Sequence, residues 1–388
     1  MNRTELFEKT KAIKPADRQA IFKAKERQAI LAKPPGSLGG LEDMSVRIAG
    51  MTGHVINKIG RGCVIVFCAD NGVAREGVSS APQSVTRAQT VNFTRRLTGV
   101  GALARSYDSE LLIVDVGVKD PIPERLYTDE PLADTHKIVN RRLRAEGQTD
   151  NIAEGPAMAE EEALRAIEIG IEMADAVSRT GFGIMGAGEM GIGNTTTSAA
   201  LLSAITGKPA EDTAGRGGGV NDTGLARKKE IINQVSAPFR EEGGVLAGPE
   251  KLRAGRMLKA LARMGGFDIC AMTGAYLGAA RNRTPIVIDG YISAVAALAA
   301  YVIAPAAADF MIASHKSFEK GYSLAVEILG LKPFLSLDMR LGEGSGCPVA
   351  FSIIRGACDV MADMATFEEA KINDDYLEEI RSEEKYQR

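Results

Sequence analysis

The stretch from Gly186 to Thr197 holds the densest group of residues that could bind a phosphate. Its glycines have no β-carbon, so they permit unusual φ angles and let a ligand approach the backbone closely. Asn194 and the threonines after it can cap the start of a helix, where unpaired amides and the positive dipole end attract a phosphate. The stretch predicts a phosphate-binding turn, although the same glycines could serve only to pack the helix.

Three of these glycines, at 186, 188 and 191, also satisfy the GxGxxG pattern of dinucleotide-binding proteins. That pattern requires an acidic residue at the end of a second strand about 20 residues further on. The candidates, Glu211 and Asp212, follow turn sequence at 206–210 instead of a strand. We therefore do not expect a dinucleotide carrier.

A second glycine cluster, at 215–219, precedes Asp222 and the basic run Arg227-Lys228-Lys229. Its backbone amides and a cation could bind the same anion as the first cluster. A solvated loop explains this local sequence equally well, so both interpretations stay open.

Glu343 lies between two glycines, directly before an apolar run. Such a carboxylate, beside an aromatic substrate, could act as a general base whose pKa is raised by desolvation. Taken alone, a glutamate in a surface loop is the commoner explanation. The polar segments 70–86 and 314–317 could also line a pocket, and no serine lies in the GxSxG turn of a serine hydrolase.

Short apolar segments typical of strands alternate along the chain with longer segments typical of helices, and both kinds hold the candidate residues in place. We expect strands over 63–69, 111–116, 182–186 and 285–289, and helices over 4–33, 41–51, 86–105, 159–179, 195–205 and 290–308. This alternation predicts an α/β fold with a mostly parallel, Rossmann-like sheet and helices on both faces. Ligands bind beyond the carboxyl ends of such strands, where the candidate loops follow. The acidic end, 366–388, is expected to form a polar helix or a frayed tail.

Composition limits the partners of the chain. With 47 basic and 50 acidic residues the net charge is -3, so we expect no nucleic-acid partner. The N-terminus lacks the apolar core of a signal peptide and the five cysteines form no CxxC pair, which favours a cytoplasmic protein. The uncharged segment 290–308 is broken by Pro305, which favours a buried core helix over a membrane span. The three scattered histidines give little support for a metal site.

Taken in order, several motifs resemble the nicotinate-nucleotide–dimethylbenzimidazole phosphoribosyltransferases of cobalamin biosynthesis. The matching pieces extend from about residue 30 to residue 365 and are Lys33 to Gly39, Ala69 to Val73, Glu76 to Ser79, Val114 to Gly117, Gly155 to Met158, Gly188 to Thr196, Gly224 to Lys228, Gly265 to Phe267, Ser314-His315 and Leu341 to Gly346.

This resemblance implies a large α/β domain over 61–344 with a parallel six-stranded sheet, a smaller helical domain from 1–60 and 345–388, and a homodimer. It implies transfer of phosphoribose from nicotinate mononucleotide to 5,6-dimethylbenzimidazole, giving α-ribazole 5′-phosphate and nicotinate, without a cofactor or a metal. Nicotinate leaves readily because its ring is positively charged in the nucleotide. A carboxylate base then needs only to remove the proton from the acceptor, which attacks the opposite face of C1′.

By position, the resemblance assigns Glu343 as the catalytic base and Glu189 as a second carboxylate facing the reaction. The other assigned residues contact the substrates. They are Gly188, Gly191, Gly193, Asn194, Thr195, Lys228 and Ser317 at the nucleotide, Ser79, Ser80 and Gln89 at the base pocket, and Leu341 at a substrate position that the resemblance does not specify. Ala81 replaces the serine or bulky residue of some relatives, which leaves the shape of that pocket open. A phenol, adenine or another acceptor, and a catalytically silent nucleotide-binding subunit, are the alternatives, and the presence of both glutamates argues against the latter.

Overall fold

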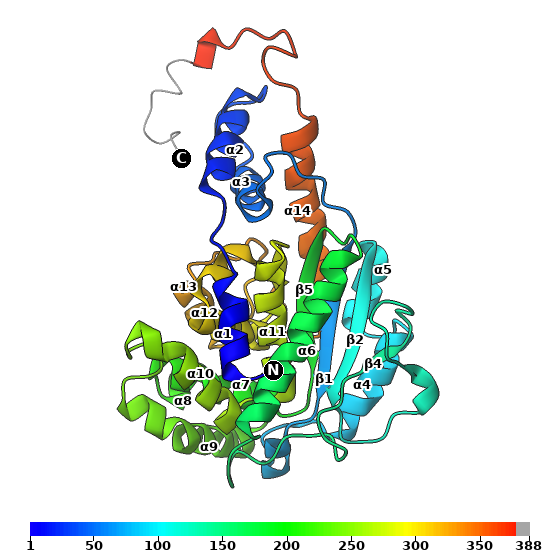
Figure 1. The fold of residues 1–388 in the computed structure, drawn as a ribbon, viewed down its shortest axis with the longest axis vertical. Helices are drawn as coiled ribbons and strands as arrows, with labels where there is room; N and C mark the ends of the chain where they lie inside the picture. Colours follow the sequence, from blue (N-terminus) through cyan, green and yellow to red (C-terminus); the bar gives the residue numbers. More distant parts are fainter. Residues whose placement is uncertain (378–388) are drawn as a thin grey trace.

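The structure, a computed structural model, describes residues 1–377 and is built around one central sheet (Figure 1). The strands are β1 Gly62–Ala69, β2 Ser109–Gly117, β3 Tyr127–Thr128, β4 Ile138–Asn140, β5 Ile184–Met190, β6 Ile286–Ile288 and β7 Met311–Ala313. The helices are α1 Arg3–Lys11, α2 Arg18–Ile30, α3 Gly40–Thr52, α4 Ser84–Thr94, α5 Gly99–Ser106, α6 Glu160–Arg179, α7 Asn194–Thr206, α8 Ala210–Thr213, α9 Asp222–Glu241, α10 Glu250–Met264, α11 Phe267–Arg281, α12 Tyr291–Ile303, α13 Tyr322–Ile328 and α14 Gly346–Asp363.

The sheet has seven strands in the order β3-β4-β2-β1-β5-β6-β7, and every neighbouring pair is parallel. The predicted α/β class is therefore confirmed, but the expected number of six strands is wrong. β3, β4 and β7 contain only two or three residues, so they have no periodicity that a sequence could reveal. The strands β1, β2 and β6 fall where the apolar runs predicted them, whereas β5 begins two residues later and ends four residues later than predicted.

Helices cover both faces of the sheet, as the alternating pattern predicts. α6, α11 and α12 lie on one face, and α5 and α14 pack against the other (Figure 1). α6 and α11 cross so closely that a β-carbon at Gly274 would lie 1.9 Å from the carbonyl oxygen of Ile167. α12 is buried as predicted, and none of the helices described up to residue 377 is long and apolar enough to span a membrane.

The segment predicted as one helix over 86–105 forms two helices, so that prediction is wrong. α4 ends at Thr94, and Arg96 then adopts a φ of 56°, a left-handed conformation that interrupts a helix. Thr98 begins α5 by accepting a hydrogen bond of 3.1 Å from the amide of Gly101. The break leaves the amino end of α5 open toward the carboxyl edge of the sheet.

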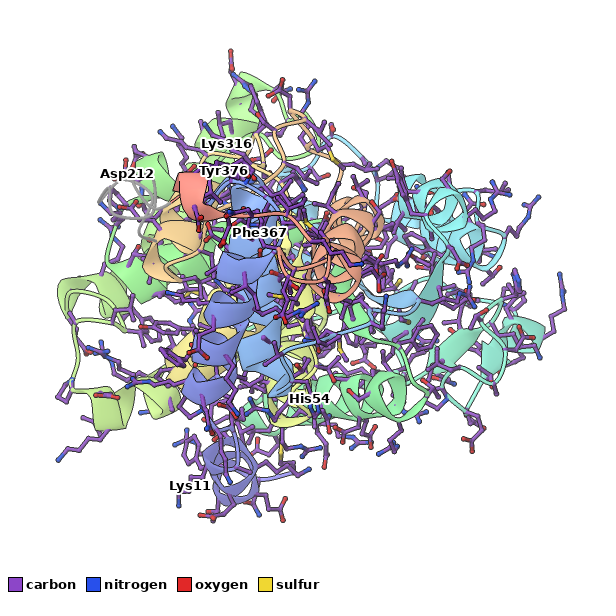
Figure 2. All side chains as sticks on the ribbon, turned by 90° about the horizontal axis from the view of Figure 1, so that it is seen from above. Lys11, His54, Asp212, Lys316, Phe367 and Tyr376 are labelled. Atoms are coloured by element: carbon purple, nitrogen blue, oxygen red, sulfur yellow. The ribbon has the colours of Figure 1, made fainter. Side chains whose placement is uncertain are left out.

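Helices α2, α3 and α14 stand together at one end of the molecule (Figure 1). They share a small core of Ala24, Ala49 and Met361. The segment after α14 returns to this group, where the amide of Phe367 donates to the carbonyl of Ile30 at 3.0 Å (Figure 2). No α-helix forms over 366–377, and the rest of the expected acidic helix or tail lies outside the described residues.

The first helix lies elsewhere. The amino group of Met1 is 2.9 Å from the Glu168 carboxylate on α6, and Leu6 is fully buried. We propose that α2, α3 and α14 form the smaller domain, with α1 attached to the larger one. The expected boundaries at residues 60 and 345 remain a proposal.

Candidate active site

Loops from four neighbouring strands meet at the carboxyl edge of the sheet. The strand order reverses between β1 and β5, and ligands of open α/β sheets bind at such a reversal. A pocket lies beyond these strand ends, and its lining includes Glu189, Thr195, Gly217, Asp289, Tyr291, Ser317, Arg340 and Leu341. The topology thus brings together the glycine turn, the second glycine cluster and the Glu343 loop, which are far apart in the sequence.

The Glu343 carboxylate is held from several directions and is 4% exposed. Its Oε1 accepts a hydrogen bond of 3.2 Å from Nε2 of Gln89 on α4, and its Oε2 accepts one of 3.1 Å from the amide of Val100 at the start of α5. Burial raises the pKa of Glu343, whereas the bonds from the α5 amides and from Gln89 lower it. This carboxylate is oriented and free of a cationic partner among the described residues, as a general base must be.

Glu189 is the penultimate residue of β5 and belongs to a buried acidic cluster. One of its oxygens accepts a hydrogen bond from Nδ2 of Asn194, which also donates to Asp268 at 3.1 Å. Its other oxygen accepts the amide of Glu343 at 3.3 Å. Burial, followed by repulsion from Asp268, raises the pKa of Glu189 to about 8, and burial raises that of Asp268 to about 7. Glu189 is therefore mostly protonated at neutral pH.

The glycines of the predicted phosphate turn divide between two roles. β5 continues to Met190, so Gly186 and Gly188 lie in a strand and not in a turn. A β-carbon at Gly188 would lie 2.4 Å from the carbonyl oxygen of Glu343, and one at Gly186 would lie 2.5 Å from Sγ of Cys347. These two glycines therefore seat the Glu343 loop and α14, which supports the packing explanation for them.

The actual turn contains Gly191 and Gly193 and leads into α7. Gly193 has a φ of 99°, and no side chain caps the helix start. The Nδ2 of Asn194 is engaged by the acidic cluster, so its donor hydrogens are not free for a phosphate. The backbone amides of Asn194 and Thr196 donate to the carbonyls of Gly191 and Gly193, so the dipole of α7 remains as the anion-attracting feature of this turn.

Lys228 approaches the same helix start from α9. Its Nζ donates to Thr195 Oγ1 at 2.9 Å and to the carbonyl of Gly215 at 3.1 Å, and the side chain is 1% exposed. Burial lowers the pKa of Lys228 to about 8. The second glycine cluster therefore does join the first, because Gly217 lies against Thr195 in the pocket wall.

Ser79, Ser80 and Gln89, which the resemblance assigns to the acceptor, do not line the main pocket. Ser79 and Ser80 line a neighbouring shallow hollow, and Ser80 Oγ donates to the carbonyl of Gly218 at 3.1 Å. Gln89 contacts Glu343 directly. Leu341 lines the main pocket and is 59% exposed, with its side chain over Gly99.

Three features of the site escaped the sequence interpretation: the Val100 amide, Asp268 and Asp289. The Val100 amide was hidden by the single helix expected over 86–105, although Thr98-Gly99 is a recognisable helix start. Asp289 is the first polar residue after the strand β6, which is the usual signal for a site residue in a parallel sheet. Asp268 lies on the buried helix α11 and had no such signal.

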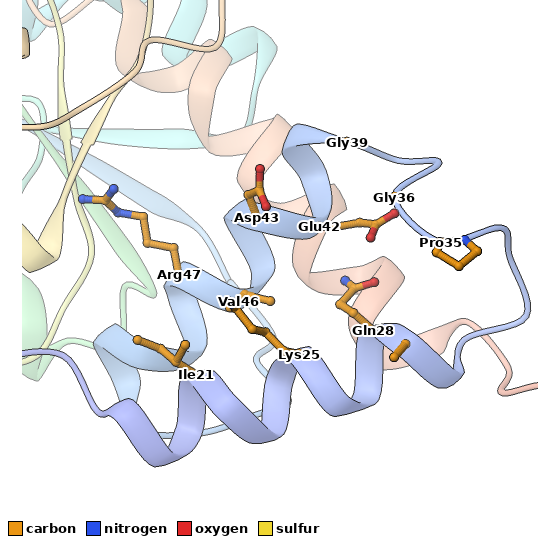
Figure 3. Close-up of a pocket in the computed structure, with 11 residues that line it drawn as sticks. Ile21, Lys25, Gln28, Pro35, Gly36, Gly39, Glu42, Asp43, Val46 and Arg47 are labelled. Carbon is orange, nitrogen blue, oxygen red and sulfur yellow. The ribbon is translucent and has the colours of Figure 1, made fainter. Parts of the chain in front are cut away.

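A larger hollow, of about 430 Å³, lies between α2 and α3 (Figure 3). Its lining includes Ile21, Gln28, Val46 and Arg47, and none of the predicted site residues. Because the strand ends and the glycine turn lie elsewhere, we place the reaction in the smaller pocket beside Glu189.

Replacing Gly191 by alanine is expected to destabilise the whole protein by about 2 kcal/mol or more. The added β-carbon would lie 2.1 Å from the carbonyl oxygen of Ala69 and 2.8 Å from Asp268 Oδ2. A melting curve measures the loss. Gly255→Ala is the matched control, because Gly255 is in α10 and nothing lies within 4 Å of its added β-carbon. An unchanged melting temperature for Gly191→Ala would contradict the close packing of this turn on β1.

Comparison with known proteins shows which class this chain belongs to. A family model described as "Phosphoribosyltransferase" matches residues 13–372, so the chain is a phosphoribosyltransferase. The nicotinate-nucleotide–dimethylbenzimidazole phosphoribosyltransferase of Clostridium perfringens is 46% identical over 381 residues, which are 98% of this chain and 99% of the relative. The chain belongs to the family of nicotinate-nucleotide–dimethylbenzimidazole phosphoribosyltransferases.

Other relatives agree in length and fold. The enzyme of the same name from Chloroflexus aggregans is 43% identical, with 93% of this chain and 96% of the relative covered. The crystal structure of CobT from Thermus thermophilus matches with a TM-score of 0.82 at 37% identity, and it covers 92% of this chain and 99% of that one.

Proposed function

We propose that this chain transfers the phosphoribosyl group of nicotinate mononucleotide to 5,6-dimethylbenzimidazole, giving α-ribazole 5′-phosphate and nicotinate for cobalamin biosynthesis. Family membership over nearly the whole chain supports the reaction. The single structural observation that carries the mechanism is the buried Glu343 carboxylate, which is fixed by Gln89 and by the Val100 amide and follows directly after the pocket-lining residues 340–342.

In the proposed mechanism Glu343 accepts the proton from one ring nitrogen of the benzimidazole, so that the other nitrogen attacks C1′ of the ribose. Nicotinate departs with the electrons of its bond to C1′, which neutralises its ring. Attack opposite the leaving group converts a β-linkage into an α-linkage. Positioning of the two substrates supplies the rest of the rate enhancement.

The nucleotide is proposed to place its phosphate at the start of α7. Thr195 and Lys228 border this position, and Ser317 lies farther along the same pocket, where we place the ribose. Glu189 faces C1′ in its protonated form. Because Glu189 is neutral, it adds no negative charge beside the base Glu343.

A homodimer and a cytoplasmic location are further proposals. Both come from the sequence, through the family resemblance and through the cysteine pattern. Sedimentation equilibrium on the purified chain measures the first, and a mass of two chains is the expected result.

Acceptor competition tests the proposed substrate. The purified chain is incubated with nicotinate mononucleotide and equal concentrations of 5,6-dimethylbenzimidazole, adenine and phenol, and the products are resolved by mass. We expect the dimethylbenzimidazole product to dominate. A dominant adenine or phenol product would favour the alternative acceptors, and no product from any acceptor would favour a silent nucleotide-binding subunit.

A further inference from the structure

The loop that carries Glu343 has an unusual backbone. Gly342, Glu343 and Gly344 have φ angles of 89°, 62° and 85°, so three consecutive residues adopt the left-handed region. Glutamate rarely adopts this conformation, and such backbone persists only where its surroundings hold it in place. The position of the proposed base therefore depends on what anchors this loop.

The anchor is Asp289, the first residue after β6. Its Oδ2 accepts a hydrogen bond of 3.0 Å from the amide of Gly344, and its Oδ1 accepts one of 2.6 Å from the amide of Gly346. The side chain is buried, with the residue 2% exposed. A β-carbon at Gly346 would lie 2.9 Å from Oδ1, so the loop passes as close to the carboxylate as its glycines permit.

The backbone of Asp289 is itself held on both sides. Its amide donates to Ser293 Oγ at 3.2 Å, and its carbonyl accepts from Ser314 Oγ at 3.2 Å. The charged or titratable groups that face it are Glu343, Glu189, Tyr276, Tyr322, Cys347 and His315. The Nδ1 atom of His315 is 4.0 Å from Oδ1 of Asp289. Burial lowers the pKa of His315 to about 4, so this histidine is neutral and no cation pairs with the carboxylate among the residues up to 377.

We propose that Asp289 is a positioning residue for the reaction, fixing the Glu343 base by binding the amides of Gly344 and Gly346. This role rests on the proposed function of Glu343. Capping of α14 accounts for the bond to Gly346, which is the first residue of that helix. It does not account for the bond to Gly344, which precedes the helix and is the residue next to the base.

Asp115 provides a matched control within the same sheet. It also lies near the carboxyl end of a buried strand, β2, and is fully buried. Its Oδ1 accepts the amides of Gly117 and Val118, at 3.0 and 2.8 Å, so it likewise holds a turn. These bonds do not reach the Glu343 loop. A substitution at Asp115 therefore tests the loss of a turn anchor without displacing the base.

The test is a double-mutant cycle between Asp289→Asn and Glu343→Gln in the full chain. Asparagine keeps the shape of the side chain but replaces one acceptor oxygen by a donor. We expect Asp289→Asn to lower kcat by about 10- to 100-fold, because a base displaced by about 1 Å loses its alignment. The Kd for nicotinate mononucleotide, from a binding titration, is expected to stay near that of the unaltered chain. In the Glu343→Gln background the same change should lower kcat very little further.

Three results would overturn the proposal. An equal fold-loss of kcat from Asp289→Asn in the chain with Glu343 and in the Glu343→Gln variant would mean that Asp289 acts independently of Glu343. A weakened Kd with an unchanged kcat would make Asp289 a substrate contact instead. An equal loss of kcat in Asp115→Asn, which we expect to lower only the melting temperature, would show a general effect of strand-end anchors.

The cycle also separates this proposal from the proposed function. Full activity of Glu343→Gln alone would show that Glu343 is not the base and would contradict the proposed function. A large loss of kcat in Glu343→Gln, together with an independent effect of Asp289→Asn, would contradict only the positioning role. If Asp289→Asn does not fold, Ser314→Ala releases the carbonyl of Asp289 without altering the carboxylate. The same cycle then applies, with a smaller loss of a few-fold expected only in the chain that retains Glu343.

Discussion

Changing Glu343 to glutamine is expected to lower kcat by about two to four orders of magnitude, the range for removal of a general base. Glutamine keeps the length of the side chain and an oxygen that can accept the Val100 amide, but it cannot take a proton. Because burial raises the pKa of Glu343, its charge is not needed for folding, and the melting temperature should not fall. Product formation and circular dichroism measure the two effects.

Glu110→Gln is the control for this substitution. Glu110 lies in β2 near the end opposite the site, where it pairs with Arg96. We expect that variant to keep kcat, even if loss of the ion pair lowers its stability. Turnover near normal in Glu343→Gln, measured beside this control, would remove Glu343 from the role of base.

Changing Lys228 to methionine is expected to weaken binding of nicotinate mononucleotide by about 10²-fold, with a smaller effect on the dimethylbenzimidazole KM. Loss of one partner of a buried, hydrogen-bonded charge pair typically costs about 2–5 kcal/mol, and methionine fills most of the vacated volume. The binding titration for each substrate measures this difference. Lys229→Met, one residue further along α9 and less buried, serves as the control.

The same lysine predicts a pH dependence. Burial lowers the pKa of Lys228 to about 8 in the free protein, and a bound phosphate raises it, because the opposite charge favours the protonated form. Nucleotide affinity should therefore be highest below pH 8 and fall as the pH rises through and above 8. Lys228→Met should lose this decline. If nucleotide affinity still declines above pH 8 in Lys228→Met, or if this variant binds the nucleotide as tightly as the unaltered chain, the phosphate does not bind beside Lys228.

The sequence predicted the parts of the fold that have strong patterns. β1, β2, β5 and β6 are apolar runs, and α6 is a long amphipathic helix with acidic residues in its first turn. β3, β4 and β7 were missed because two or three residues carry no pattern. The break between α4 and α5 was missed because helical periodicity outweighed the Thr98-Gly99 start signal.

For the site, the local sequence offered Glu343 and the basic run with Lys228 as candidates, the resemblance assigned their roles, and the structure supplied their physical setting. The contact of Gly188 with the Glu343 loop could not be predicted, because that loop comes from a distant part of the chain and packs over β5. Asn194 illustrates the same limit. Its position suggested a helix cap, whereas its side-chain amide links Glu189 to Asp268. Asp268 lies 74 residues further along the chain than Asn194.

The most direct test of the proposed function is the product that the purified chain forms from nicotinate mononucleotide and 5,6-dimethylbenzimidazole. The proposed mechanism predicts one nicotinate released for each α-ribazole 5′-phosphate formed, with the α-configuration at C1′ established by nuclear magnetic resonance. A product of β-configuration would contradict direct attack opposite the leaving group. Release of nicotinate with free ribose 5-phosphate as the only other product would contradict transfer to the base.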